Sequence, residues 1–374
     1  MRFSDIPGLE NVKQKLYRTI ESGKVAHAQL FAGTEGSANL SMAIAYAALL
    51  NCTNRKDGDS CGECPSCHKI GKSIHPDLHF VFPVSATKEK TGKEVISDSF
   101  IAEWREFIRQ NPYGGPYEWS LEFGGENKQL NISREESRNI IKKLALKSFE
   151  GEYKVMIIWL AEYLHPSAAN ALLKLLEEPP GKTVFLLITY DHEQIISTIL
   201  SRVQLLKIKS FRKEEVSNYL VDRYEINTDK AIQIANIASG DLNLAIKMID
   251  EVEDDTHQLF QEWMRICFLN NHSKMVEWAE NFSKTNKISQ KGLFQYGLSI
   301  LRESLLMQNG SEESINLTDS ENKFVTNFSK TLDLAKLEKL YNLLNSGCYH
   351  LERNGNTKII FLDTSLQITS TFRS

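Results

Sequence analysis

Short, wholly apolar segments alternate with helical patterns through the first half of the chain, and this alternation leaves few folds open. The segments are AQLFAG, YKVMIIWL, TVFLLIT and VQLLKIKSF, with HPDLHFVFPV as a further strand candidate. Between them, SMAIAYAALL and PSAANALLKLLEEPP have the apolar content and spacing of helices. Strands that are apolar on both faces are typical of a parallel sheet covered by helices on both sides. The sequence therefore predicts an α/β domain followed by an all-α region.

Domain boundaries follow from where this alternation stops. A chain of 374 residues is too long for a single core. We predict an α/β domain over residues 1–207, a small helical domain over 208–251 and a C-terminal helical domain over 252–374. Two segments interrupt the first domain: a cysteine-rich loop at about 52–67 and a polar insertion, rich in glycine and aromatic residues, at about 84–130.

The insertion and the segment after it give two local predictions. One helix is expected at DSFIAEWREFIRQ, and the aromatic residues between Trp104 and Phe123 suggest that the insertion packs against something, although its role is not evident. The segment ISREESRNIIKKLALKSF then predicts an amphipathic helix. Ser133 is its expected N-cap, with Glu136 three residues further on as the partner in a capping box.

The stretch HAQLFAGTEGSANLSMAIA has the outline of a phosphate-binding loop, with a strand, a glycine-containing turn and a helix. A working loop reads G-x-x-x-x-G-K-[ST], because backbone N–H groups cradle the phosphates, the lysine reaches the β/γ-phosphates and the hydroxyl holds Mg²⁺. Counting from Gly33, with Gly36 inside the turn, Ala38 replaces the second glycine, Asn39 the lysine and Leu40 the hydroxyl residue. Gly33 and Gly36 therefore belong to a degenerate cofactor-binding loop.

Four of the six cysteines form a tight cluster with the spacing C-x₈-C-x₂-C-x₂-C: Cys52, Cys61, Cys64 and Cys67. In a reducing compartment such a cluster indicates a metal site rather than disulfides. Four thiolates complete a tetrahedral shell with no open position, so a bound Zn²⁺ would be structural. Gly62 and Pro65 suit the tight turns that present paired sulfur atoms to one ion.

Other residues near or like these ligands are expected to be structural. We predict that the neighbouring histidines are surface residues: His68, His75 and His79. Cys267 and Cys348 lie alone in helical patterns and are predicted to be core residues.

Three local features together resemble a known family. SAANALLKLLEEPP followed by TVFLLIT and then TILSRVQ lies downstream of the degenerate loop and the four-cysteine module. This combination resembles the AAA+ subunits of the bacterial DNA polymerase III clamp loader, and most closely the delta-prime subunit. The resemblance covers residues 1–250 in architecture. It implies an AAA+ domain, a helical lid and a C-terminal collar domain.

The resemblance also assigns positions to the rest of an ATPase site. Active relatives carry Asp-Glu after an apolar strand, and those positions are Trp159 and Leu160 here, while Glu162 is displaced in register. The lid arginine that senses phosphates in active members appears here as Asn243. Without the loop lysine and these acids, phosphoryl transfer loses its positioning and its charge stabilisation. We therefore expect no intrinsic ATPase activity and leave nucleotide binding without turnover open.

The resemblance assigns one catalytic group that this chain still carries. The family's Ser-Arg-Cys motif presents an arginine across a subunit boundary to the γ-phosphate of a neighbour. Ser201 and Arg202 match this motif, and Val203 stands at the cysteine position. The resemblance therefore implies that Arg202 acts as a trans arginine finger.

The implied function is a subunit of the DNA polymerase III holoenzyme in DNA replication. Its partners would be gamma/tau and delta subunits in a hetero-pentameric ring, a sliding clamp, and primed DNA through the complex. A net charge of −4 fits weak DNA contact by this chain alone. The start MRFSDIPGLE is no secretory signal, and no apolar run is long enough for a membrane helix, so we expect a cytoplasmic protein.

Two alternatives stay open from the sequence. The first is a gamma/tau-type motor subunit, which also carries the four-cysteine module but requires a loop lysine and an Asp-Glu pair. The second is a zinc-dependent adaptor on an inactive AAA+ fold, which would have no use for a finger at Arg202.

Overall fold

The computed structural model describes the chain except for residues 126–127, 250–255, 286, 309–316, 318, 353–354 and 374. The described chain divides into two compact units. The first holds residues 1–211 with 241–243, and the second holds 212–240 with 244–374. The predicted boundary between 251 and 252 lies outside the described residues, so the division into three domains stays a prediction.

A parallel five-stranded sheet forms the centre of the first unit, as predicted. Its strands are β1 (Ala28–Ala32), β2 (Leu78–Val81), β3 (Lys154–Ile158), β4 (Thr183–Thr189) and β5 (Gln204–Lys207). Their order is β2-β3-β4-β1-β5. Leu30 of β1 pairs with Leu187 of β4 on one side and with Leu205 of β5 on the other. Each apolar segment singled out in the sequence of the first unit therefore supplies one strand.

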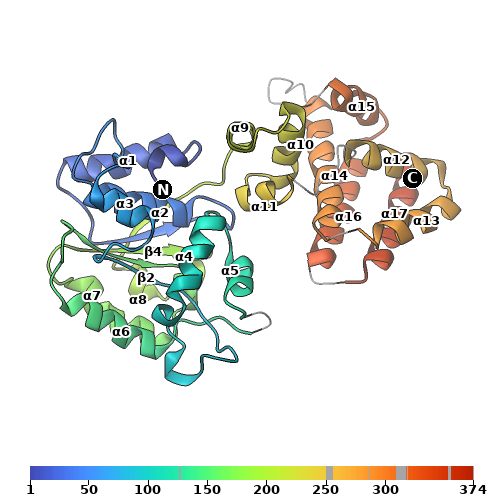
Figure 1. Cartoon of the computed structure of the whole chain (residues 1–374). Helices are drawn as coiled ribbons and strands as arrows, with labels where there is room; N and C mark the ends of the chain where they lie inside the picture. The colour runs from blue at the N-terminus through green and yellow to red at the C-terminus, as the bar shows by residue number, and fades with distance from the viewer. Residues whose placement is uncertain are drawn as a thin grey trace. The chain divides into compact units, whose positions relative to one another are not determined.

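Helices cover both sides of this sheet (Figure 1). On one side lie α1 (Glu10–Glu21), α2 (Asn39–Asn51) and α3 (Pro65–Gly71), and on the other α6 (Arg134–Ala145), α7 (Pro166–Glu177) and α8 (Ser197–Leu200). Every residue of α2 is buried, which explains why its sequence is apolar all round instead of amphipathic.

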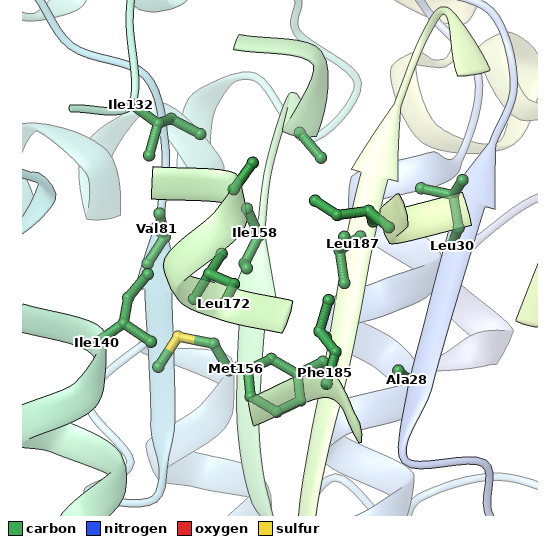
Figure 2. Packing of buried hydrophobic residues seen from close by; sticks show 14 of the residues in the cluster. Ala28, Leu30, Val81, Ile132, Ile140, Met156, Ile158, Leu172, Phe185 and Leu187 are labelled. Carbon is green, nitrogen blue, oxygen red and sulfur yellow. The ribbon is translucent and has the colours of Figure 1, made fainter. Parts of the chain in front are cut away.

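The core on the second side of the sheet joins strands to α6, α7 and α8. Figure 2 shows Ile140 and Leu172 facing Met156, Ile158 and Leu187, and all five side chains are almost fully buried. Because successive strand residues point to opposite faces, Met156 and Ile158 face this core while the residue after the strand, Trp159, faces the other side. The sheet thus separates two hydrophobic layers.

The insertion forms part of that other layer. It contains a 3-10 turn at Ser97–Phe100, α4 (Ile101–Gln110) and α5 (Pro116–Glu122). The predicted helix is therefore confirmed as the turn plus α4, whereas α5 was not predicted. Trp104 and Trp119 are fully buried, so the expectation that the aromatic residues pack against something is correct.

The predicted capping box at the start of α6 is wrong. Ser133 is the N-cap residue, but its side chain makes no capping hydrogen bond. The carboxylate of Glu136 instead accepts a hydrogen bond from the backbone N–H of Ser97, at 2.6 Å. A contact with the insertion has replaced the local one, and α6 ends at Ala145, before the predicted end at Phe149.

Helices are the only regular elements among the described residues of the second unit. It contains α9 (Lys213–Tyr224), α10 (Thr228–Ala238), most of α11 (Leu242–Lys247), α12 (Thr256–Leu269), α13 (His272–Phe282), α14 (Lys287–Gln308), α15 (Asp319–Ser329), α16 (Leu334–Glu352) and α17 (Thr357–Arg373). Trp263 stacks on Phe361 with ring centroids 4.6 Å apart in its core. Cys267 and Cys348 are buried as predicted. No helix among the described residues is long and apolar enough to cross a bilayer.

Candidate functional site

The degenerate phosphate loop connects the end of β1 to the start of α2. Its two glycines are both sterically required. A Cβ on Gly33 would lie 2.4 Å from the carbonyl oxygen of Ile208, and Gly36 has a φ of +72°. A strand, a tight turn and a helix therefore follow one another here in the predicted order.

Asn39, at the lysine position, faces the protein instead of a ligand. Its side chain is fully buried. Nδ2 donates to the carbonyl oxygen of Thr189 at the end of β4, over 3.3 Å. Its Oδ1 accepts from the hydroxyl of Ser37, over 2.8 Å. Leu40, at the hydroxyl position, is also buried. These groups tie the loop to the sheet, and neither side chain is placed to bind a phosphate.

Residues 241–243, at the start of α11, cover the loop from outside. The backbone N–H of Leu242 donates to the carbonyl oxygen of Gly36, over 3.0 Å. A carboxylate oxygen of Asp241 lies 1.8 Å from the place where a Cβ on Gly36 would stand. An active loop holds phosphate anions near these glycines, so an acidic side chain here opposes phosphate binding. Asn243, the predicted lid position, belongs to this same segment.

The two positions of the missing Asp-Glu pair are occupied by apolar core residues. Trp159 and Leu160 are fully buried. The indole of Trp159 lies 5.1 Å from that of Trp104 and 5.5 Å from the ring of Phe107, measured between ring centroids. Trp104 also stacks on Phe82, at 4.1 Å. The insertion therefore builds an aromatic cluster where an active relative would place its metal and its water-polarising base.

Glu162 does not replace the missing base. It lies in a 3-10 turn (Ala161–Tyr163), and its Oε1 accepts a hydrogen bond from the backbone N–H of Tyr190, over 3.1 Å. Burial raises the pKa of the Glu162 carboxyl. The side chain thus connects two loops at the ends of β3 and β4.

Arg202 lies at the surface, just after α8. Its side chain is 32% exposed, and Ser201 beside it is exposed. Nε donates to Oε1 of Glu177, over 2.7 Å, and Nη2 pairs with the same oxygen. Nη1 donates to the carbonyl oxygen of Thr198, over 2.8 Å. Val203 packs against the core shown in Figure 2, consistent with a packing role for the third motif position.

The four cysteines converge on one point. Their sulfur atoms all lie within 4.8 Å of one another. The Sγ atoms of Cys52 and Cys61 are 3.6 Å apart, and those of Cys61 and Cys67 are 3.9 Å apart. A tetrahedral zinc ion with Zn–S bonds of about 2.3 Å separates its sulfur ligands by about 3.8 Å. The geometry therefore fits one metal ion bound by four thiolates.

Backbone N–H groups lower the pKa of two of these thiols, Cys61 and Cys64, whereas burial raises the pKa of Cys52 and Cys67. The N–H of Cys64 donates to the sulfur of Cys61, and the N–H of Cys67 to that of Cys64. Burial opposes ionisation of Cys64, but N–H donation from Cys67 and Thr53 outweighs it and lowers the pKa of the Cys64 thiol to about 6. The predicted turns are present: Gly62 has a φ of +75°, and Pro65 is the first residue of α3.

The prediction that the nearby histidines lie at the surface is correct only in part. His68 is exposed and His79 is half-buried, but His75 is buried. The Nδ1 atom of His75 accepts a hydrogen bond from the backbone N–H of Asp77, over 3.1 Å. His75 therefore stabilises the turn before β2 and is not part of the cysteine cluster.

Three features of the site were not predicted from the sequence: the ion pair between Arg202 and Glu177, the bond from Asn39 to β4 and the cover over Gly36. Each joins residues that are distant in sequence.

Comparisons with known proteins identify the family of this chain. A sequence model of the family described as "DNA polymerase III, delta subunit" matches residues 8–212. The DNA polymerase III subunit delta' of Bacillus subtilis (strain 168) is 24% identical over 308 residues, covering 81% of this chain and 79% of that protein. The DNA polymerase III subunit tau/gamma of Haemophilus influenzae is 25% identical over 254 residues, covering 67% of this chain and 30% of that protein.

The tau/gamma relatives are longer proteins, and this chain spans about a third of their length. A solved DNA polymerase III gamma-subunit-related protein from Thermotoga maritima aligns with 96% of this chain and 99% of its own, at 16% identity and a TM-score of 0.37. The match to the family model covers more than half of the chain. The chain therefore belongs to the DNA polymerase III delta subunit family, among the bacterial clamp-loader proteins with an AAA+ fold.

Proposed function

We propose that this chain is a delta-prime-like, non-hydrolysing subunit of the DNA polymerase III clamp loader, which supplies Arg202 in trans to a neighbouring ATPase subunit. One contrast carries the proposal. The chain's own phosphate loop is closed by its buried Asn39 and covered by Asp241, whereas Arg202 lies at the surface. The chain lacks the side chains that would use a nucleotide in its own phosphate loop. It keeps an arginine that would act on a nucleotide bound by a neighbouring subunit.

Phosphoryl transfer depends on positioning and on charge stabilisation, which here would need a lysine, a metal ligand and a water-orienting acid. Buried Asn39, Trp159 and Leu160 stand at these three positions. An arginine finger contributes charge stabilisation from outside and needs only a neighbour with an intact site. Arg202 on an exposed loop meets that requirement.

The remaining parts of the proposed assembly come from the family. Gamma/tau and delta subunits would form a hetero-pentameric ring with this chain, held through its C-terminal helices, and the ring would load a sliding clamp onto primed DNA. The four cysteines would hold one structural Zn²⁺, which brings the loop after α2 and the start of α3 together and supplies no chemistry to the reaction.

Similarity alone does not separate this assignment from a gamma/tau-type motor, because delta' and tau/gamma relatives have nearly the same identity to this chain. The aromatic cluster around Trp159 argues against a motor. A zinc-dependent adaptor on an inactive AAA+ fold remains the alternative from a different functional class. It predicts that substitution of Arg202 has no effect on clamp loading.

Clamp loading onto primed circular DNA tests the proposal. Gamma/tau and delta subunits are combined with the wild-type chain, with its Arg202→Ala variant, with an Arg109→Ala control, or with no further subunit. Arg109 is an exposed arginine of α4 paired with Glu106, so its loss removes an equal charge elsewhere. We expect loading with the wild type and the control, and strongly reduced loading with Arg202→Ala. Equal loading with the wild type and with Arg202→Ala would refute the proposal.

A further inference from the structure

Every nitrogen of the Arg202 guanidinium has a partner within its own chain. Nε and Nη2 both bind the same carboxylate oxygen of Glu177. Nη1 donates to the carbonyl oxygen of Thr198, over 2.8 Å, and to the hydroxyl of Ser201, over 3.1 Å. All three nitrogens thus have partners within the chain, and these contacts use four of the five N–H donors. A neighbour's phosphate that is bound by two of these donors must therefore displace at least one partner.

Glu177 is held firmly within reach of Arg202. It is the last residue of α7, and the preceding turns of α7 insert Leu172 and Leu176 into the core. Arg202 follows directly on α8, which contributes Ile199 to the same core. The two helices pack against each other, so the carboxylate and the guanidinium meet without any movement of the backbone.

The ion pair itself is exposed and therefore replaceable. The side chain of Glu177 is 48% exposed and that of Arg202 is 32% exposed. Exposed pairs of this kind contribute little to stability, since water screens them and two long side chains lose freedom. Glu177 uses only one of its two carboxylate oxygens to bind Arg202, whereas a terminal phosphate offers three oxygens and more charge to the guanidinium fork.

We propose that Glu177 acts as a latch on Arg202, competing with the γ-phosphate of a neighbouring subunit for the same guanidinium nitrogens. The inference rests on the proposed trans role of Arg202 and deepens it. The latch keeps the finger on its own subunit until a neighbour loaded with a nucleoside triphosphate displaces the carboxylate. When hydrolysis removes the γ-phosphate, Glu177 binds Arg202 again.

A double-mutant cycle in the assembled complex tests the latch. The variants are Glu177→Gln, Arg202→Ala, both together, and Glu178→Gln as the matched control. Glu178 is exposed and lies next to Glu177, so its substitution removes the same charge and keeps the bond between Glu177 and Arg202. The measured quantity is kcat/KM for ATP, because it compares the free, latched state with the transition state.

We expect Glu177→Gln to raise kcat/KM by about two- to fivefold, the factor set by the strength of an exposed ion pair. Glu178→Gln should leave kcat/KM unchanged. In the Arg202→Ala background, Glu177→Gln should have no effect, since there is nothing left to release. This last comparison separates a latch from a general electrostatic effect.

The outcomes separate the two claims. If Arg202→Ala leaves kcat/KM unchanged in an assembled complex, the proposed function itself fails. If Arg202→Ala lowers kcat/KM, the latch is refuted by any of three results for Glu177→Gln: no change, a decrease, or an increase that persists without Arg202.

Discussion

Replacing Trp104 by alanine should destabilise the first unit by about 3–5 kcal/mol, the usual cost of truncating a buried tryptophan. Trp104 is fully buried and lies within 6.0 Å of five other aromatic rings, measured between centroids: Phe80, Phe82, Phe107, Trp119 and Trp159. Aromatic pairs add about 0.5–1.5 kcal/mol each beyond their buried area. The expected loss is a large fraction of the stability of a typical domain, about 5–15 kcal/mol.

Hydrogen exchange resolved by segment is the appropriate assay, because the chain has two units and a single unfolding midpoint would combine them. Backbone amides of β3 and β4 report the opening of the whole sheet. The free energy of opening at these amides should fall by about 3–5 kcal/mol in Trp104→Ala. The control is Tyr117→Ala, whose side chain is 65% exposed, and its effect should stay within about 0.5 kcal/mol.

Loss of protection from hydrogen exchange in the insertion alone would contradict this prediction. If α4 and α5 exchange faster while β3 and β4 change by less than about 1 kcal/mol, the insertion folds as an independent attachment. The aromatic cluster would then not be part of the sheet's core. The claim that it fills the place of a catalytic metal site would lose its structural support.

Three further predictions concern the metal site, a buried carboxylate and the phosphate loop. Elemental analysis of the purified chain should find one zinc ion. The Cys64→Ser variant should lose this ion, whereas Cys267→Ser should retain it. Equal zinc content in the two variants would contradict the predicted zinc site. Burial opposes ionisation of Asp77, but three backbone N–H groups of the loop after α6 lower its pKa below the usual 3.8. Asp77→Asn should therefore reduce the free energy of unfolding at neutral pH by roughly 1–3 kcal/mol. This difference from the wild type should vanish as the pH falls through the depressed pKa of Asp77. Denaturant titration at several pH values measures the difference, and a difference that stays constant with pH would contradict the prediction. Asn39→Lys should not create ATP turnover in the isolated chain, because Trp159 still occupies the place of the metal ligand; measurable turnover would contradict the account of the site.

The sheet could be predicted from the sequence because burial on both faces leaves a direct mark, namely a short run of apolar residues. Helix α4 could also be predicted, because its apolar residues recur at helical spacing. The second insertion helix, α5, was not predicted because Gly115 and Pro116 together favour a turn. In the structure Pro116 occupies the first helical position, and the carboxylate of Glu118 accepts from the N–H of Gly115, over 2.7 Å.

The candidate site was predictable where its chemistry depends on spacing along the chain. The cysteine cluster and the degenerate loop are local motifs, so residue order was enough to locate them. Contacts between distant segments leave no such mark. The carboxylate of Asp241 over Gly36 and the pairing of Glu177 with Arg202 depend on how the chain folds back on itself. For the same reason Glu136 binds the insertion instead of its own helix N-terminus.

ATP turnover by gamma/tau-type subunits with clamp and primed DNA tests the trans role of Arg202 most directly. Turnover is compared for the wild-type chain, the Arg202→Ala variant and no added chain, after size-exclusion chromatography shows that both forms assemble. A finger raises turnover at its own site by roughly 10³-fold or more, and by less when averaged over a ring with several sites. We predict that the wild type stimulates turnover and that Arg202→Ala assembles without stimulating it. Equal stimulation by both assembled forms would contradict a trans role for Arg202.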